Sequence, residues 1–143
     1  MADNIVIPDC GKNKLLELML GLDLAENLQL KLFTNDATLA AATVASDLTE
    51  MDTHGYAAKT LAMASWGAPS VAAGMAGSSY AQQVFTATDD DDGTTTNVYG
   101  YYVVMATTGT LMWACEFGAP KPMTYENETI SITPQLQFGQ QSA

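Results

Sequence analysis

The stretch at residues 97–117 constrains the fold more than any other part of the chain. It reads NVYGYYVVMA, then TTGT, then LMWACEF. The outer runs are rich in β-branched and aromatic residues, which favour strands, and the polar connection with its glycine is typical of a hairpin. Both faces of the first run are apolar, so we expect that strand to be covered on both sides. Two paired strands cannot bury such surface alone, and the rest of the chain must cover them.

Alternating apolar and polar residues predict further strands. They fall at residues 28–33, 56–63, 80–88 and 130–138. In the last of these, Pro134 lacks a backbone donor, so we expect that strand to lie at an edge or to bend there. Together with the hairpin, these strands predict one mainly β domain: an antiparallel β-sandwich of jelly-roll-like form with one short N-terminal helix.

Three segments are expected to connect the strands. Residues 37–52 are predicted to form a loop with one short strand or helical turn. Residues 72–79 contain two glycines and small side chains, which is typical of a connection. Residues 119–122 contain two prolines, which predicts a rigid, extended link. We assign residues 1–11 to an N-terminal arm, 12–139 to the sandwich and 140–143 to a tail.

The N-terminal part combines an apolar triplet with a helix. Ile5, Val6 and Ile7 are expected to form either an edge strand or an arm that adds a strand to a neighbouring subunit. The helix is expected to begin near Lys12, with Asp9 as a cap, and to end at a glycine. Its leucines lie nearly all round, which predicts a buried helix. The expected core of the domain contains Leu16, Leu20, Leu30, Leu32, Phe85, Val104, Trp113, Phe117, Ile130 and Ile132.

The charge balance bears on partners. Sixteen acidic residues face five lysines and no arginine, for a formal net charge of −11. The basic surface that nucleic acid or an anionic membrane attracts is missing, so we expect neither as a partner. The acidity serves solubility or complements a basic partner surface. No apolar run reaches the length of a membrane span and the N-terminus lacks a signal-peptide pattern, so we expect the product to stay in the cell that makes it.

Few residues suggest chemistry. His54, with Asp47 or Asp52 behind it, would need a serine nucleophile, and no Gly-x-Ser-x-Gly elbow is present. We therefore expect an ordinary loop histidine, no catalytic residue, no enzyme activity and no cofactor. Zinc is not expected, because His54 and the two cysteines lack ligand spacing. Cys10 and Cys115 are expected to remain thiols, a bridge between them after release to an oxidising exterior being the alternative.

Four consecutive aspartates are weak calcium candidates: Asp89, Asp90, Asp91 and Asp92. An EF-hand ending its acidic half at Gly93 would start at Thr88 and end at Tyr99, and neither supplies a carboxylate, so a solvated loop is the alternative. Aromatic residues are enriched at protein interfaces. Trp66, Tyr99 and Tyr101 are therefore interface candidates together with Ile5, Val6 and Ile7, with core packing as the alternative for the aromatics.

An ordered set of segments carries a resemblance. The segments are LLELMLG at 15–21, LKLFTND at 30–36, GY at 55–56, YAQQVFT at 80–86, VYGYYVV at 98–104, LMWACEF at 111–117 and ISITP at 130–134. In order and content this set resembles a family of small structural proteins encoded by tailed bacteriophages, cyanophages among them. The four-aspartate loop departs from the family pattern.

The resemblance implies a non-enzymatic virion protein. The expected role is capsid cement or decoration, in which the protein binds the assembled shell on its exterior and stabilises contacts between major capsid proteins. It also implies a homotrimer that is made in the host cytoplasm. A tail or fibre component is the alternative, and a calcium- or sugar-binding β module is a second alternative.

Overall fold

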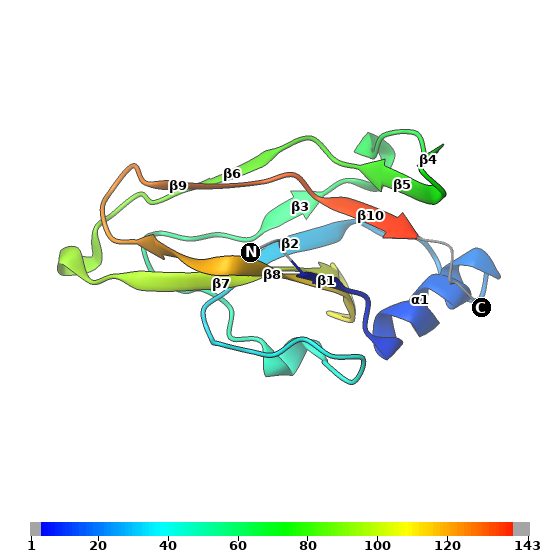
Figure 1. Ribbon diagram of the computed structural model, residues 1–143, viewed down its shortest axis with the longest axis horizontal. Helices are drawn as coiled ribbons and strands as arrows, with labels where there is room; N and C mark the ends of the chain where they lie inside the picture. Colours follow the sequence, from blue (N-terminus) through cyan, green and yellow to red (C-terminus); the bar gives the residue numbers. More distant parts are fainter. Residues whose placement is uncertain (1–3, 139–143) are drawn as a thin grey trace.

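The computed structural model describes residues 4–138. Its main layer is a five-stranded antiparallel sheet in the order β1-β8-β7-β2-β3 (Figure 1). These strands are β1 (Asn4–Val6), β2 (Leu28–Phe33), β3 (Lys59–Leu61), β7 (Thr96–Met105) and β8 (Leu111–Met123). The predicted hairpin is its centre: β7 and β8 pair along most of their length, with register shifts near Gly100 and Val104.

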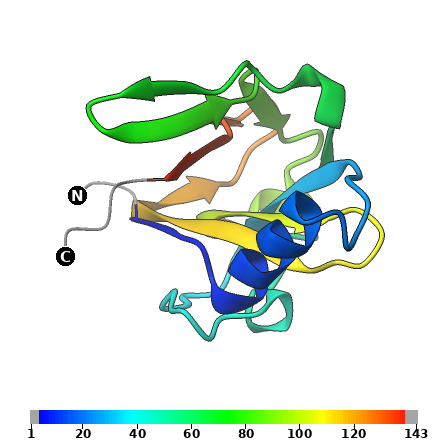
Figure 2. The ribbon, with the colours of Figure 1, turned by 90° about the vertical axis from the view of Figure 1, so that its right-hand side faces the viewer.

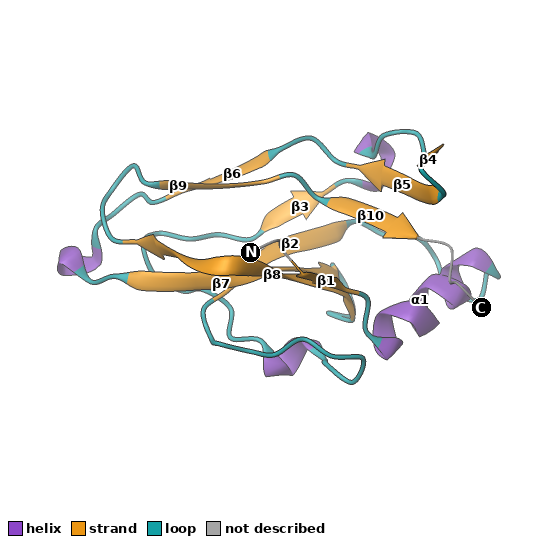
Figure 3. Cartoon of the chain, viewed as in Figure 1, coloured by secondary structure: helices purple, strands orange, loops and turns teal. Residues whose placement is uncertain are grey.

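The second layer consists of two smaller sheets that lie over the main one (Figure 3). One contains β10 (Gln135–Phe138), β5 (Met75–Ser79) and β4 (Ser70–Ala72), and the other contains β6 (Gln83–Thr86) and β9 (Thr129–Ile132). All their pairings are antiparallel. The mainly β single-domain sandwich is therefore confirmed. The predicted bend at Pro134 is confirmed too, because the chain passes there from one small sheet to the other.

The remaining elements are short. Within residues 4–138 there is one α-helix, α1 (Asp9–Met19), and there are three 3-10 turns, η1 (Ala45–Asp47), η2 (Met63–Ser65) and η3 (Asp91–Gly93). None of the helices in this part of the chain is both long and apolar enough to cross a membrane. The loop at residues 37–52 contains η1 and one bridge, from Phe33 to Glu50, as expected.

Two apolar clusters cover the two faces of the main sheet. The larger fills the space between the layers and includes Leu30, Trp113 and Ile132. The smaller lies on the opposite face and includes Phe33 and Leu48. Strands β7 and β8 contribute to both clusters, which confirms that this hairpin is covered on both sides. Eight of the ten expected core residues are buried: Leu30, Leu32, Phe85, Val104, Trp113, Phe117, Ile130 and Ile132.

The prediction of a buried helix is wrong. Leu16 and Leu20 are 52% and 64% exposed. Only one side of α1 meets the sandwich, where Leu15 and Leu18 pack against the larger cluster. Gly11 lies so close to β8 that an added Cβ would be 2.2 Å from the Met112 carbonyl oxygen. A single helix at the end of a sandwich has no second layer to cover its outer face.

Two predicted connections are strands. Residues 72–79 contain most of a hairpin, because β4 and β5 pair as Val71 with Ala76 and Ala72 with Met75. Residues 119–122 are extended as expected but belong to β8, where Lys121 pairs with Val98. Small residues gave no strand pattern in the first case. In the second, the prolines lie on a part of β8 that pairs with β7 on one edge only, since β1 pairs with β8 only at residues 114–116. The strand expected at 56–63 is limited to β3.

Residues 4–6 form an edge strand, not an arm that leaves the body. Ile5 pairs with Cys115, and Val6 packs on the smaller cluster. Ile7 packs on the larger cluster, so the apolar triplet is used within its own domain. Residues 1–3 of the expected arm and the tail at 140–143 lie outside the described residues. Cys115 is buried, as expected, and Cys10 is half-buried.

Candidate functional site

His54 is held in a tight turn beside the aspartate loop. His54 and Gly55 both have positive φ, +56° and +67°. A Cβ on Gly55 would be 1.8 Å from the Thr88 hydroxyl oxygen, so only glycine fits there. The backbone N–H of Thr88 donates to the His54 carbonyl at 3.0 Å. This contact brings residues 54 and 88 together although they are far apart in the sequence.

The aspartate loop folds back on its own side chains. Asp91 and Asp92 also have positive φ, a conformation that aspartate tolerates better than most residues. The Asp89 carboxylate accepts from the Asp91 N–H at 3.2 Å, and the Asp90 carboxylate accepts from the Asp92 N–H at 3.1 Å. The run is therefore a structured turn as well as a charged one.

The turn and the loop meet in a histidine–aspartate cluster made of His54, Asp89 and Asp91. The backbone N–H of His54 donates to Asp91 Oδ2 at 2.5 Å. The imidazole Nδ1 lies 3.2 Å from the Asp89 carbonyl oxygen and 3.7 Å from Asp91 Oδ2. One potential ligand atom from each of the three residues lies within 4.8 Å of the others. These residues come from two segments that share no sequence motif.

The electrostatics of the cluster differ between its two carboxyls. A hydrogen bond from the His54 backbone lowers the pKa of Asp91. A hydrogen bond with Asp91 raises the pKa of Asp89, and burial and the nearby charge of Asp91 act in the same direction. The His54 side chain is fully buried, and its Nε2 has no hydrogen-bond partner among the described residues. One imidazole with two carboxylates suits zinc better than calcium, which prefers six to eight oxygens.

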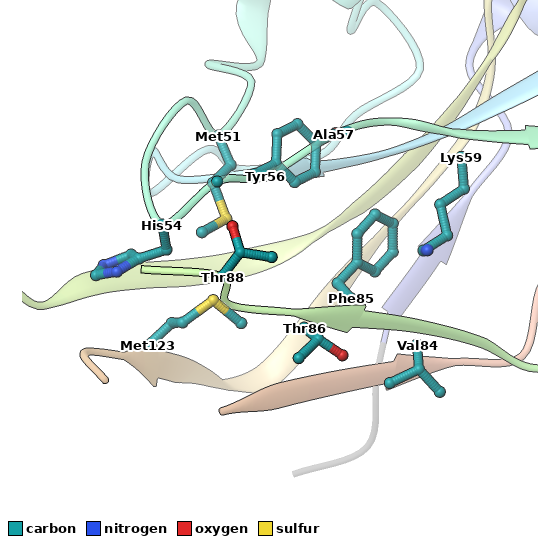
Figure 4. Close-up of a pocket in the computed structure, with 11 residues that line it drawn as sticks. Met51, His54, Tyr56, Ala57, Lys59, Val84, Phe85, Thr86, Thr88 and Met123 are labelled. Atoms are coloured by element: carbon teal, nitrogen blue, oxygen red, sulfur yellow. The ribbon is translucent and has the colours of Figure 1, made fainter. Parts of the chain in front are cut away.

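A pocket of about 250 Å³ lies beside His54, between the turn, β6 and β8 (Figure 4). Phe85 lies at its centre, stacked on Tyr56 with ring centroids 5.7 Å apart, and Lys59 Nζ lies 5.3 Å from the Phe85 centroid. The Tyr56 hydroxyl donates to Glu50 and accepts from the Leu32 N–H, both at 3.2 Å. Burial raises the pKa of Tyr56, so its hydroxyl stays neutral. The pocket combines an aromatic wall with one cation.

Carboxylates gather around this region, which we call the acidic end. Its members are Asp52, Asp89, Asp90, Asp91, Asp92, Glu126 and Glu128. The loop that holds Glu128 joins the aspartate loop through a bond from the Ala87 N–H to the Glu128 carbonyl at 2.9 Å. Segments 51–58, 87–96 and 124–128 contain no lysine. Figure 1 shows η3 at the left extreme of the molecule, opposite α1.

The other extreme is apolar. We call the apolar end the five large side chains on and after α1 that are more than half exposed: Leu16, Met19, Leu20, Leu22 and Leu24. The three most exposed of these side chains are Met19 at 74%, Leu22 at 75% and Leu24 at 84%. Figure 2 looks onto this extreme, with α1 below and the hairpin of β4 and β5 above. Val71 and Met75 of that hairpin are exposed as well.

An apolar groove of about 200 Å³ lies at the same extreme, between α1 and the second layer. Leu15 and Leu18 of α1 line one side, and Met63, Trp66 and Leu136 also line it. Trp113 lies in the groove too and meets Trp66 edge-on, with centroids 5.9 Å apart. The groove therefore gives access to the end of the core between the two layers, next to the exposed leucines.

The charged groups near the apolar end are paired with one another. Lys14 Nζ lies 2.5 Å from a Glu17 carboxylate oxygen and 2.8 Å from Asp23 Oδ2. These bonds raise the pKa of Lys14 and lower that of Asp23. Glu26 accepts from the Thr107 N–H at 3.0 Å. One lysine offsets one of these three carboxylates, so this extreme keeps a small negative charge.

The aromatic interface candidates lie in packed surroundings. Trp66 is half-buried between Tyr80 and Trp113. Tyr101 is buried against Phe117, with centroids 6.4 Å apart, and Tyr99 packs on the smaller cluster. The first apolar candidate, Ile5, is partly exposed at the sheet edge. Of the six, Trp66 lines the apolar groove beside the exposed leucines of the apolar end.

Sequence reasoning found part of one extreme and missed the other. It named Asp89, Asp90, Asp91 and Asp92 as weak calcium candidates but expected His54 to be an ordinary loop histidine, whereas the structure places Asp89 and Asp91 beside it. The available signal was weak: His-Gly and Asp-Gly pairs are both typical of positive φ. It also assigned the helix leucines to the core, so the exposed set at residues 16–24 was not recognised.

Comparison with known proteins does not connect this arrangement to a family. No family model matches the chain, and neither a curated protein nor a solved structure matches it.

Proposed function

We propose that this protein is a non-enzymatic structural protein that acts through contacts with other proteins, and that it serves as capsid cement on the exterior of a bacteriophage virion. The observation that supports a contact role is the apolar end. Large contiguous apolar surfaces are uncommon on proteins that act alone and mark interaction sites. Here such a surface persists on a chain with a net charge of −11.

The more specific role comes from the resemblance to small phage structural proteins. In that role the partners are the major capsid protein and further copies of this chain, which form a homotrimer. A small β-sandwich with two packed layers of strands suits a protein that binds across the contacts between capsid subunits that have already folded. A tail or fibre component remains the alternative, and it uses the same kind of surface.

Binding to shells tests the proposal. Purified protein is added to particles of the encoding phage that lack it, and bound protein is measured by co-sedimentation and located by cryo-electron microscopy. The expected result is saturable binding at fixed positions on the capsid exterior. Density on tails or fibres would support the alternative, and absence of binding to any particle component would contradict both. The neighbouring genes provide an independent check, since a cement gene is expected beside the major capsid gene.

Cation binding is a second candidate function, favoured by the histidine–aspartate cluster. Calorimetry with zinc and with calcium, each at up to about millimolar concentration, measures it directly. The expected result is one site that prefers zinc and that Asp91→Asn removes, while Asp36→Asn, an exposed aspartate elsewhere, leaves it intact. No heat with either ion and an unchanged melting temperature would contradict this candidate.

A further inference from the structure

We infer that the apolar end joins copies of this chain to one another, an inference that rests on the proposed structural role. Two complementary shapes lie at the same extreme of the molecule. Leu16, Met19 and Leu20 protrude from α1, and the apolar groove lies on the other side of that helix. Every copy therefore offers both a ridge and a groove, and symmetric association uses both.

Charge favours a second copy at this surface over other parts of the molecule. Copies with a net charge of −11 repel one another. At the apolar end the repulsion is smaller than at the acidic end, because Lys14 offsets part of the charge of Glu17 and Asp23, whereas the acidic end has no lysine in its three segments. Contact there also keeps the acidic ends at the far extremes of the two molecules. Screened by physiological salt over about 8 Å, those distant carboxylates oppose the contact weakly.

The area is sufficient for a stable contact. Five exposed side chains present on the order of 500 Å² of apolar surface. The groove and the exposed Val71 and Met75 of the neighbouring hairpin extend it. The total approaches the roughly 800 Å² that each partner buries in a standard protein–protein interface.

Light scattering on the purified protein tests the inference without any shell. At about 50 μM the natural chain is expected to give the mass of two or more protomers. Leu20→Lys, on the ridge, and Met63→Lys, in the groove, are each expected to give a monomer with an unchanged circular dichroism spectrum. Tyr125→Lys, which replaces an exposed side chain at the acidic end, is the matched control and should associate like the natural chain.

Mixing the two monomeric variants sharpens the test. The intact groove of Leu20→Lys and the intact ridge of Met63→Lys can still form one ridge–groove contact, so a mixed species is expected at high concentration. A natural chain that is monomeric at about 100 μM would overturn the inference, and so would variants that associate unchanged. Shell binding by a monomeric natural chain would overturn only the inference, whereas an associated chain that binds no particle would contradict only the cement role.

Discussion

The two extremes of the molecule solve opposite problems. At the acidic end, like charges crowd into a loop, and backbone N–H groups, including that of His54, donate to the carboxylates. At the apolar end, charges are few and Lys14 bonds to two carboxylates, while leucines remain in water. The first arrangement is satisfied mostly within one chain, because the carboxylates find donors nearby, although His54 Nε2 has no hydrogen-bond partner among the described residues. The second is incomplete, because apolar surface gains nothing until another surface covers it.

The largest expected difference in stability is between replacing the buried His54 and replacing the exposed Leu20. His54→Ala removes a fully buried ring at the acidic end and should lower the free energy of unfolding by about 2–4 kcal/mol, as for other large-to-small core changes. Leu20→Ala at the apolar end should change it by less than about 0.5 kcal/mol. Urea unfolding of the two variants measures both. Equal changes in the free energy of unfolding would contradict the view that the acidic end is packed within the chain and the apolar end is not.

The next effect concerns how the helix is attached. Gly11→Ala would raise helix propensity, yet its Cβ meets the Met112 carbonyl, so we expect destabilisation by about 1–3 kcal/mol. Asn13→Ala, on the exposed side of the same helix, should stabilise by a few tenths of a kcal/mol. Thermal unfolding compares the two. A stabilising Gly11→Ala would show that α1 can move away from β8 without loss.

Acid should weaken both ends. The pKa values of Asp91 and Glu128 are lowered by backbone hydrogen bonds, and those of Asp23 and Glu26 by Lys14 and Thr107 respectively. Each contributes stability above its unfolded-state pKa of about 4, and this is lost as the pH falls through the lower folded-state value. Asp89, whose pKa is raised, contributes in the opposite sense, below that value. The melting temperature should therefore decrease as the pH is lowered below about 4. A melting temperature at pH 3 equal to that at neutral pH would contradict this prediction.

The smallest effect is that of salt. Raising ionic strength from about 0.05 to 0.5 M should raise the melting temperature slightly, because it screens repulsion at the acidic end. Replacing both Asp90 and Asp92 with asparagine should raise the melting temperature at low salt and reduce its dependence on salt. Asparagine keeps the turn, since it caps and tolerates positive φ as aspartate does. Unaltered salt dependence in this variant would place the repulsion elsewhere.

The sequence predicted the centre of this fold better than its periphery. The hairpin at 97–117 could be found because both faces of its strands are apolar, and the bend at Pro134 because proline lacks a donor. The hairpin of β4 and β5 could not, because alanine, glycine and serine have low strand propensity and are mostly exposed there. The helix was expected to be buried because its leucines define no single face, and only the position of the sheet decides which of them are covered.

The candidate sites were hidden for a different reason. His54 meets Asp91 only because Thr88 bonds to the turn at His54, a contact between segments whose sequences give no sign of each other. The exposed leucines were visible but were interpreted as core. The apolar end depends on which surfaces the two layers leave uncovered, and the histidine–aspartate cluster depends on a contact between distant segments. Local sequence patterns carry little information on either.

The order of the main sheet has a consequence for how the chain is made. Asn4 pairs with Glu116 and Leu28 with Met105, so β1 and β2 wait for partners that are synthesised much later than they are. Contacts between such distant segments form slowly. Until they form, the leucines of β2 are exposed in every nascent chain, where they could aggregate. The excess of acidic residues keeps nascent copies apart during this interval, so the same charge that the folded acidic end must neutralise protects the chain before it folds.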